Sequence, residues 1–497
     1  MRSLFPRIFA TGLLLPALSP SLIAEVTLPK VLGDHMVLQR SQPVPVWGEA
    51  APGETVTVKF QQQEKHATAD AGGKWSVTLD ALKASNHPAT LTISGTNQIV
   101  LRDILVGEVW LCSGQSNMES PAGKDHKNLK AAATADPVLA EDLQGKGFPE
   151  IRLFRVEKKL QPPDVVSEGW KIATPDAIAP YSAVGYTFAR KLQRELGVPV
   201  GMIQSAWGGT RIEVWTPAEA YQNHPAFHQA TQASPLKIDG LIPGSHYTAM
   251  VLPLAPFSIK GAVWYQGESN VVDLNDAPTY ADKFEAMVQS WRAAWHQPSL
   301  PVFSVQIAPY LYSIREKDPV THTTASLPEF WETQFLTTRI PHTGIVPSMD
   351  IVDNYKDIHP LRKRPIGERL ASLALADVYQ RKNLTTSGPV FQSATFNENT
   401  ATLTFKHVGK GLQAVDGKPL THFEIAGADG VFQPAEARVT SPDTIVATSE
   451  TVTQPSTVRY AWHEAANPNL TNDAGWPAFP FRSNPASWHP KLSRTRK

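Results

Sequence analysis

The chain has 497 residues, 42% of them hydrophobic, and its 46 basic and 46 acidic residues give a formal net charge of zero. A balanced charge provides no long-range attraction for nucleic acid or for an anionic membrane, since both require clustered positive charge. The partners expected are therefore small or neutral molecules. Cys112 is the only cysteine, which excludes an intramolecular disulfide, and we expect it to pack in an apolar core.

The first 24 residues have the pattern of a secretory signal peptide. Basic residues near Met1 precede an apolar run, Ile8–Leu18, and small residues lead to Ala24. The apolar run is too short to span a membrane comfortably, and no other stretch is long and apolar enough. Cleavage after Ala24 would remove two arginines and leave 44 basic and 46 acidic residues, a net charge of −2. We expect an exported protein, periplasmic or secreted, without a membrane anchor.

Residues 25–104 alternate between apolar and polar residues, as short antiparallel strands do. The alternation is clearest in Thr55–Phe60, Trp75–Leu79 and Leu91–Ile93, and turn residues such as Pro52 and Gly53 separate these stretches. This region contains no cluster of catalytic residue types. It is predicted to be a small N-terminal β-sandwich-like domain.

Residues 105–385 alternate instead between apolar strand-like runs and amphipathic helical patterns. Such alternation predicts a parallel sheet covered by helices on both faces, with ligands bound beyond the carboxyl ends of its strands. Gly197 is placed to cap the first long helix, and Asp377 is expected at the wet edge of the last one. The expected helices lie around 184–196, 280–295 and 366–377, and the expected strands are Val200–Ala206, Lys260–Tyr265, Val302–Ile307 and Gly344–Met349.

A period of two returns after Gly388. Strands are expected at Thr402–Phe405 and Thr457–Trp462, which predicts a C-terminal β-domain over residues 386–483. The basic tail, residues 484–497, is expected to be disordered.

Polar residues follow several of the expected strands of the central region. Ser116 follows an apolar run in a turn that would leave its hydroxyl exposed, although such a turn is by itself an ordinary loop. In an extended segment, residues i and i+2 face the same side, and Pro360 keeps His359 out of the helical conformation. Asp357 can therefore lie within reach of His359, as the supporting half of a hydrolytic triad. A loop histidine with a chance acidic neighbour gives the same pattern.

Four of these segments together resemble the sequence blocks of sialate O-acetylesterases, within the SGNH (GDSL-like) hydrolase superfamily. The resemblance extends to Asp34–Gln39 and Tyr460–Trp462, so it covers most of the chain. The four blocks are Ser-Gly-Gln-Ser-Asn-Met (113–118), Trp-Gly-Gly-Thr (207–210), Trp-Tyr-Gln-Gly-Glu-Ser-Asn (264–270) and Asp-Ile-His-Pro (357–360).

The resemblance implies an SGNH-type three-layer α/β hydrolase domain that needs no cofactor or metal. Ser116 would be the nucleophile and His359 the base. The superfamily usually has its acid three residues before the histidine, where this chain has Lys356; Asp357 is the candidate acid here. The implied oxyanion hole uses the Ser116 N–H, a glycine N–H and a side chain of the third block, and the implied substrate is an O-acetylated sugar. The oxyanion candidates are Gly208, Gly209, Asn270 and Gln266, and the substrate-binding candidates are Gln115, Arg211 and Glu268. Arg211 could pair with an anionic substrate group such as a sialate carboxylate through its bidentate guanidinium, or be a surface or structural arginine.

Three alternatives remain open from the sequence. The same machinery could deacetylate xylan or another neutral polysaccharide, because the blocks specify acyl chemistry and not the sugar. A zinc deacetylase lacks support, since no H-E-x-x-H run is present and Pro225 separates His224 from His228. A catalytically inactive glycan-binding protein is the third. The sequence does not indicate an oligomeric state.

Overall fold

The computed structural model describes residues 25–229 and 234–485. The predicted signal peptide, and the predicted disordered tail from residue 486 on, lie outside these residues. Within the described part of the chain, no helix is long and apolar enough to cross a membrane.

A mostly parallel sheet forms the centre of the molecule, in the order β13-β12-β11-β7-β10-β8-β9, with only β9 antiparallel to its neighbour. Three of its inner strands, β10, β11 and β12, are buried along their whole length, as expected for a sheet covered on both faces. The strands are β7 (Gln98–Gly114), β8 (Phe148–Arg155), β9 (Trp170–Ala173), β10 (Val200–Ala206), β11 (Gly261–Tyr265), β12 (Val302–Val305) and β13 (Thr343–Val346).

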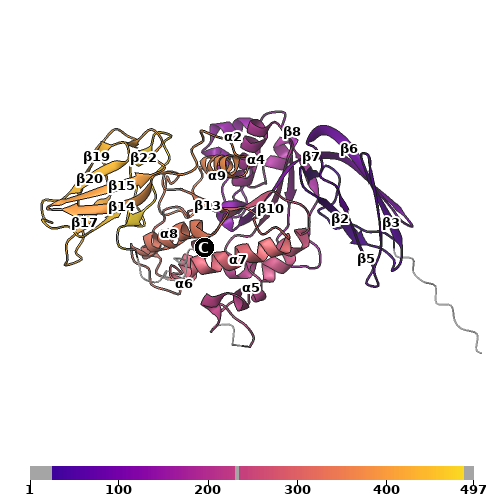
Figure 1. Cartoon of the computed structure of the whole chain (residues 1–497), viewed down its shortest axis with the longest axis horizontal. Coiled ribbons are helices and arrows are strands. Elements are labelled where there is room, and N and C mark those ends of the chain that lie inside the picture. Colours follow the sequence, from indigo (N-terminus) through magenta and orange to yellow (C-terminus); the bar gives the residue numbers. More distant parts are fainter. Residues whose placement is uncertain (1–24, 230–233, 486–497) are drawn as a thin grey trace, which may run out of the picture.

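Helices cover both faces of this sheet. Figure 1 shows α4 and α9 on one side and α7 and α8 on the other. The predicted parallel sheet between helix layers is therefore present. The longer helices are α4 (Ala183–Leu196), α7 (Tyr280–Ala294), α8 (Ser326–Leu336) and α9 (Arg364–Asp377); the shorter ones are α1 (Ser116–Glu119), α2 (Pro137–Asp142), α3 (Pro175–Ile178), α5 (Ala218–Gln222) and α6 (Glu268–Leu274).

Local sequence signals set several of these boundaries. Gly197 ends α4 with φ +65, the left-handed conformation in which glycine is favoured. Strand β10 has the predicted bounds, and Asp377 is exposed at the end of α9 as expected.

The N-terminal region consists mostly of antiparallel strands, several of them with alternating burial, and is joined directly to the central sheet through β7; β1 instead pairs with β7 in parallel. The first half of β7 pairs with β6, and its second half lies between β10 and β11. One strand of 17 residues thus crosses the boundary expected at residues 104 and 105. The other strands are β1 (Val37–Gln39), β2 (Val44–Glu49), β3 (Thr55–Phe60), β4 (Gln63–Thr68), β5 (Lys74–Leu79) and β6 (Ser85–Ser94).

The C-terminal region is an assembly of small antiparallel sheets at the opposite end of the molecule (Figure 1). Two four-stranded sheets, β14-β15-β20-β19 and β18-β17-β21-β23, are accompanied by the pair β16-β22. The strands are β14 (Val390–Asn397), β15 (Thr400–Lys406), β16 (Leu412–Ala414), β17 (Phe423–Ala426), β18 (Gln433–Pro434), β19 (Glu436–Ser441), β20 (Thr444–Thr448), β21 (Thr457–Tyr460), β22 (Leu470–Asn472) and β23 (Phe481–Arg482).

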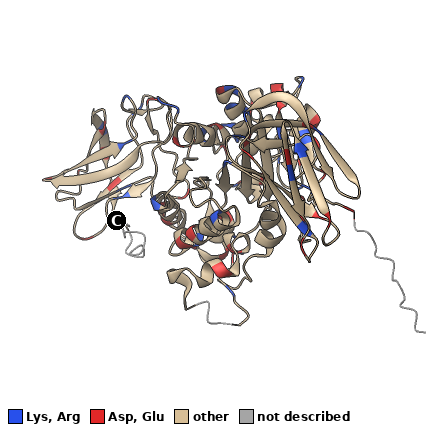
Figure 2. Ribbon diagram, turned by 45° about the vertical axis from the view of Figure 1, so that its right-hand side comes forward, with Lys and Arg blue, Asp and Glu red and all other residues tan. Residues whose placement is uncertain are grey.

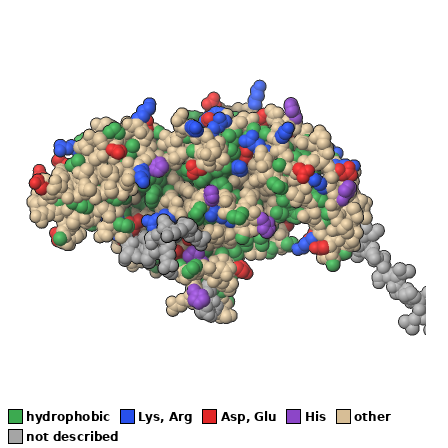
Figure 3. Space-filling view, viewed as in Figure 1, with side chains coloured by type: hydrophobic (Ala, Val, Ile, Leu, Met, Phe, Trp, Pro, Cys, Tyr) green, Lys and Arg blue, Asp and Glu red, His purple; other side chains and the backbone are tan. Residues whose placement is uncertain are grey.

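Charged residues of both signs are interspersed over all three regions, as Figure 2 shows. The face drawn in Figure 3 likewise mixes basic, acidic and apolar side chains.

Candidate active site

Ser116 lies at the carboxyl end of β7, the strand in the middle of the central sheet. Gly114, the last residue of β7, has φ +137, and a Cβ there would come within 2.1 Å of the Tyr265 carbonyl oxygen. Only glycine therefore allows β7 to approach β11 so closely before the chain turns into α1. Ser116 is the first residue of that short helix and is partly exposed.

His359 reaches Ser116 from the loop that joins β13 to α9. The imidazole Nε2 lies 2.9 Å from the Ser116 Oγ, a hydrogen-bonding distance. Burial, with the charge of Lys363 adding to it, lowers the pKa of His359 to about 4, although Asp357 and Glu119 act in the opposite direction. The imidazole is therefore neutral at neutral pH, which leaves a nitrogen lone pair able to accept the serine proton.

Asp357 is a weaker partner than the sequence implied. Its Oδ1 is 3.7 Å from the His359 Nδ1, beyond a hydrogen bond, and its side chain is 48% exposed. The same oxygen accepts the backbone N–H of His359 at 2.9 Å. The carboxylate therefore shapes the loop, and its hold on the imidazole in this structure is electrostatic only.

The two glycines expected in the oxyanion hole differ in availability. Gly208 packs against Ser116, with the position of a Cβ only 3.1 Å from the Ser116 Cβ. Its N–H donates to Glu119 Oε2 at 2.9 Å, and the other Glu119 oxygen pairs with Lys158. An internal carboxylate thus occupies the Gly208 donor, so Gly208 can serve a substrate oxygen only after Glu119 has moved. The N–H groups of Ser116 and Gly209 donate to no other described residue.

Asn270 and Gln266, the expected side-chain donors, are fully buried, and both are hydrogen-bonded within the protein. Asn270 Nδ2 donates to Asp276 at 3.0 Å and to Glu213 at 3.3 Å. Gln266 Nε2 donates to Asn270 at 2.7 Å and to Gln115 at 3.1 Å. Neither amide has a free N–H for an oxyanion, because each is already shared among internal acceptors.

Gln115 connects the Ser116 turn to the loop that follows β11. Its Oε1 accepts from Gln266 Nε2 and from the N–H groups of Gly267 and Ser269. No described residue accepts from its Nε2, so this amide keeps a donor next to Ser116.

Arg211, expected to bind an anionic substrate group, is only 6% exposed. Its Nη2 donates to the Asp239 carbonyl at 2.8 Å, and its Nε lies 3.6 Å from Glu213. The charge of Arg211 is therefore committed within the protein. It borders a buried group that we call the Lys283 cluster, in which Lys283 pairs with Glu213, Asp239 and Asp276 and to which Asn270 is bonded.

Glu268, also expected to contact substrate, is 2% exposed and belongs to a second buried group. Its Oε1 accepts from Asn117 Nδ2 at 2.5 Å, and its Oε2 has no hydrogen-bond partner among the described residues. The Asn117 Oδ1 in turn accepts from Lys363 Nζ. We call this the Lys363 cluster, defined by Asn117, Glu268 and Lys363, and it lies directly beside the Ser116 turn.

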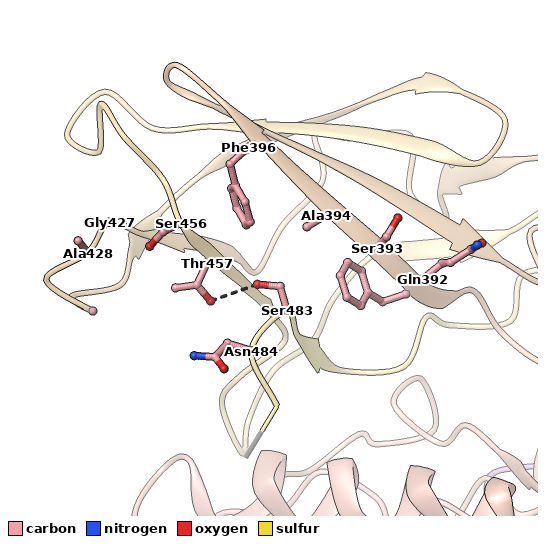
Figure 4. A pocket seen from close by; sticks show the side chains of 12 residues that line it. Gln392, Ser393, Ala394, Phe396, Gly427, Ala428, Ser456, Thr457, Ser483 and Asn484 are labelled. Atoms are coloured by element: carbon pink, nitrogen blue, oxygen red, sulfur yellow. Dashed lines mark hydrogen bonds between the residues drawn. The ribbon is translucent and has the colours of Figure 1, made fainter. Parts of the chain in front are cut away.

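Cys112 and a hollow in the C-terminal region do not offer comparable chemistry. Cys112 is buried, and burial raises the pKa of its thiol to about 12, so it packs as a neutral group. A hollow of about 410 Å³ in the C-terminal region is lined only by residues without ionisable side chains, including Phe396, Ser456 and Thr457 (Figure 4). Among the described residues, no group of three or more His, Cys, Asp or Glu side chains could hold a metal ion.

Comparisons with known proteins identify the family of this chain. Residues 106–376 match the family described as carbohydrate esterase, sialic acid-specific acetylesterase. The chain belongs to this family. The matched residues contain Ser116, His359 and the whole Lys363 cluster. As a member of the sialic acid-specific acetylesterase family, the protein is a carboxylic ester hydrolase.

Individual relatives extend the similarity to most of the chain. The sialate O-acetylesterase of Homo sapiens is 30% identical over 72% of this chain and 72% of its own length. That of Rattus norvegicus is also 30% identical, over 72% of this chain and 74% of its own length. A carbohydrate acetylesterase from Xanthomonas citri is 35% identical, with a TM-score of 0.81 over 92% of this chain and 99% of its own.

Sequence reasoning missed Glu119, Asn117 and Lys363. Asn117 lies within the first family block, so the sequence places it beside Ser116 but does not indicate what it binds. Lys363 sits in the run Arg362-Lys363-Arg364, which resembles a solvated basic surface. Burial of that one lysine depends on tertiary packing, which local sequence does not encode.

Proposed function

We propose that this protein is a serine esterase of the SGNH type that removes O-acetyl groups from sugars, with O-acetylated sialic acid as its first substrate. One observation carries the proposal: the neutral His359 imidazole lies 2.9 Å from the Ser116 Oγ at the carboxyl edge of the central sheet. Family membership supplies the acetylated sugar.

The reaction follows from this pair. His359 Nε2 accepts the proton as Ser116 Oγ attacks the acetyl carbonyl carbon, and the Ser116 and Gly209 N–H groups are the free donors for the oxyanion. The tetrahedral intermediate breaks its bond to the sugar oxygen, which leaves with the proton from His359. Water, deprotonated by the same imidazole, then attacks the acetyl-serine and releases acetate.

The pH dependence of kcat/KM tests the state of the base. Because burial lowers the pKa of His359 to about 4, the imidazole becomes protonated and unable to accept a proton only below that pH. Activity on an acetyl ester should therefore stay high from pH 7 down to about pH 5 and fall near pH 4. A fall centred near pH 6.5 would mean that the base is an ordinary solvated histidine.

Replacement of the nucleophile is the decisive experiment. Ser116→Ala should lower hydrolysis of 4-nitrophenyl acetate by at least about 1,000-fold and abolish labelling by a fluorophosphonate, with an unchanged circular dichroism spectrum. Ser120→Ala, four residues away, is the matched control and should keep both activities. Normal labelling of Ser116→Ala would refute the proposal, and absence of labelling in the wild type would favour a glycan-binding protein.

A neutral acetylated polysaccharide such as acetylxylan is a second candidate substrate. The contacts of Arg211 favour this substrate. Its guanidinium already pairs with Glu213 and donates to the Asp239 carbonyl, so it is not free to bind a sialate carboxylate. A panel of O-acetylated sialic acids and acetylated xylan oligosaccharides, compared by kcat/KM, separates the two substrates.

A further inference from the structure

Asn117 occupies an unusual position between the two catalytic segments. It follows Ser116 directly, and its Nδ2 donates to the carbonyl of Ile358 at 3.0 Å, the residue before His359. The same nitrogen donates to Glu268, while Oδ1 accepts from Lys363, four residues after His359. One side-chain amide thus ties the nucleophile turn to both ends of the histidine segment.

The partners of Asn117 fix the orientation of this amide. A lysine ammonium can only donate and a carbonyl can only accept, so Oδ1 must face Lys363 and Nδ2 must face Ile358 and Glu268. Both hydrogens of the amide and one lone pair of its oxygen are used. Asn117 is 0% exposed, so these bonds do not compete with bulk water.

Lys363 is in an electrostatically costly place. It is 0% exposed and stands at the N-cap of α9, where the helix dipole already disfavours a cation. Burial lowers the pKa of Lys363 to about 7, against the attraction of Glu268 and Asp357. Besides Asn117, its described contact is the ring face of Tyr265, whose centroid lies 5.6 Å from Nζ. Buried groups with strongly perturbed pKa values cluster at functional sites.

We propose that the Lys363 cluster is the positioning device of the catalytic pair: Asn117 sets the distance between Ser116 and His359, and Lys363 fixes the Asn117 amide and places a positive charge beside the histidine segment. This inference rests on the proposed roles of Ser116 and His359. The charged and titratable groups acting on His359 are Lys363, Asp357 and Glu119. Lys363 is the only cation among them, so the loss of its charge should raise the pKa of His359, which burial still lowers.

The test is the rate of fluorophosphonate labelling of Ser116 as a function of pH, which needs no knowledge of the natural sugar. Lys363→Gln keeps a hydrogen-bond donor but removes the charge. We expect the low-pH fall of its labelling rate (the acid limb) to move up by about 0.5 pH unit or more, because the charge of Lys363 adds to burial in lowering the pKa of His359. Lys363→Arg, which keeps the charge, should restore the wild-type limb.

A matched control is Lys191→Met. Lys191 also contacts α9, through the Ser372 hydroxyl at 2.6 Å, and burial lowers its pKa as well. Its replacement should leave both the labelling rate and the acid limb unchanged. If Lys363→Gln slows labelling without moving the limb, Lys363 is merely structural and the proposal fails.

The positioning role of Asn117 has its own variant, which also serves if Lys363→Gln does not fold. Asn117→Ala should slow labelling at least about tenfold while KM for 4-nitrophenyl acetate stays within twofold of wild type; a wild-type rate would overturn the proposal. Ser116→Ala is run alongside. If Ser116→Ala still reacts, the proposed function is wrong, whereas an inert Ser116→Ala with unaffected Lys363 and Asn117 variants refutes only the positioning device.

Discussion

Two lysines near the candidate site are equally buried, and their surroundings differ. Lys283 is 0% exposed and contacts three carboxylates, Asp239 at 2.5 Å, Asp276 at 2.6 Å and Glu213 at 2.7 Å. Burial alone would lower the pKa of Lys283, but these carboxylates raise it above its usual value. Lys363 is also 0% exposed, contacts an amide oxygen, and has its pKa lowered to about 7.

The difference separates a lysine whose charge is compensated by neighbouring carboxylates from one whose charge is much less compensated. A buried ion is stabilised when opposite charges surround it, and removal of one partner then leaves the others uncompensated. Lys283 joins α7 to the segments that carry Glu213 and Asp276, which positions the loops after β10 and β11. Lys363 is less compensated, and it lies beside Ser116 and His359.

The largest effect on stability is expected from Lys283→Met. It leaves Glu213 and Asp276 buried without their cation, so the free energy of unfolding should fall by about 3–5 kcal/mol. A urea titration followed by tryptophan fluorescence measures this change. The folded fraction should keep its labelling rate within about threefold of wild type. A loss below 1 kcal/mol would show that the two lysines do not differ as described.

Asn270→Ala should have a smaller effect on stability, because it removes one hydrogen-bonding member of the Lys283 cluster. We expect a loss of about 1–3 kcal/mol in the free energy of unfolding and less than about tenfold in kcat. An oxyanion-hole donor would instead cost about 100- to 1,000-fold in kcat. Steady-state hydrolysis of 4-nitrophenyl acetate, corrected for folded protein, distinguishes the structural from the catalytic role of this amide.

Asp357→Asn should have the smallest effect. Its carboxylate is half-exposed and 3.7 Å from the imidazole, and exposed ion pairs contribute about 1 kcal/mol or less. The expected loss in kcat/KM is therefore about fivefold at most, with Lys356→Gln as the neighbouring control. A loss near 10,000-fold, as the tautomer-fixing acid of a triad would give, would show that Asp357 closes onto His359 during catalysis.

Most elements of the fold were predictable because their signals are local. The apolar run of β10 is bounded by Pro199 and Trp207-Gly208, and Gly197 marks the end of α4. The continuity of β7 was not predictable. Its alternation breaks at Asp103, which has φ +57 and pairs with Arg152 of β8, so a distortion inside one strand resembled a domain boundary.

The candidate site likewise contains residues that the sequence identifies and residues whose roles depend on tertiary packing. Ser116 and His359 could be found because a turn, a proline and the family blocks mark them in the chain. The side chains around them could not be assigned, because an amide such as Asn270 has the same local sequence whether it faces a substrate or an internal carboxylate. The choice is made by Lys283 and Asp276, and Lys283 lies 13 residues further along the chain.

Because β7 belongs to both the N-terminal and the central sheet, the N-terminal strands are expected to be required for the fold of the central region. A protein shortened to begin at residue 105 would lose Gln39 and Arg40, the partners of Glu108, whose side chain is 2% exposed. It would also begin inside the strand that leads to Ser116, two residues before Gly107, where a Cβ would lie 1.9 Å from the Pro199 carbonyl oxygen. The N-terminal strands therefore cannot be removed as a separate domain, because the N-terminal sheet and the central sheet share strand β7. A chimera that takes its N-terminal region from a homologue should include the whole of β7.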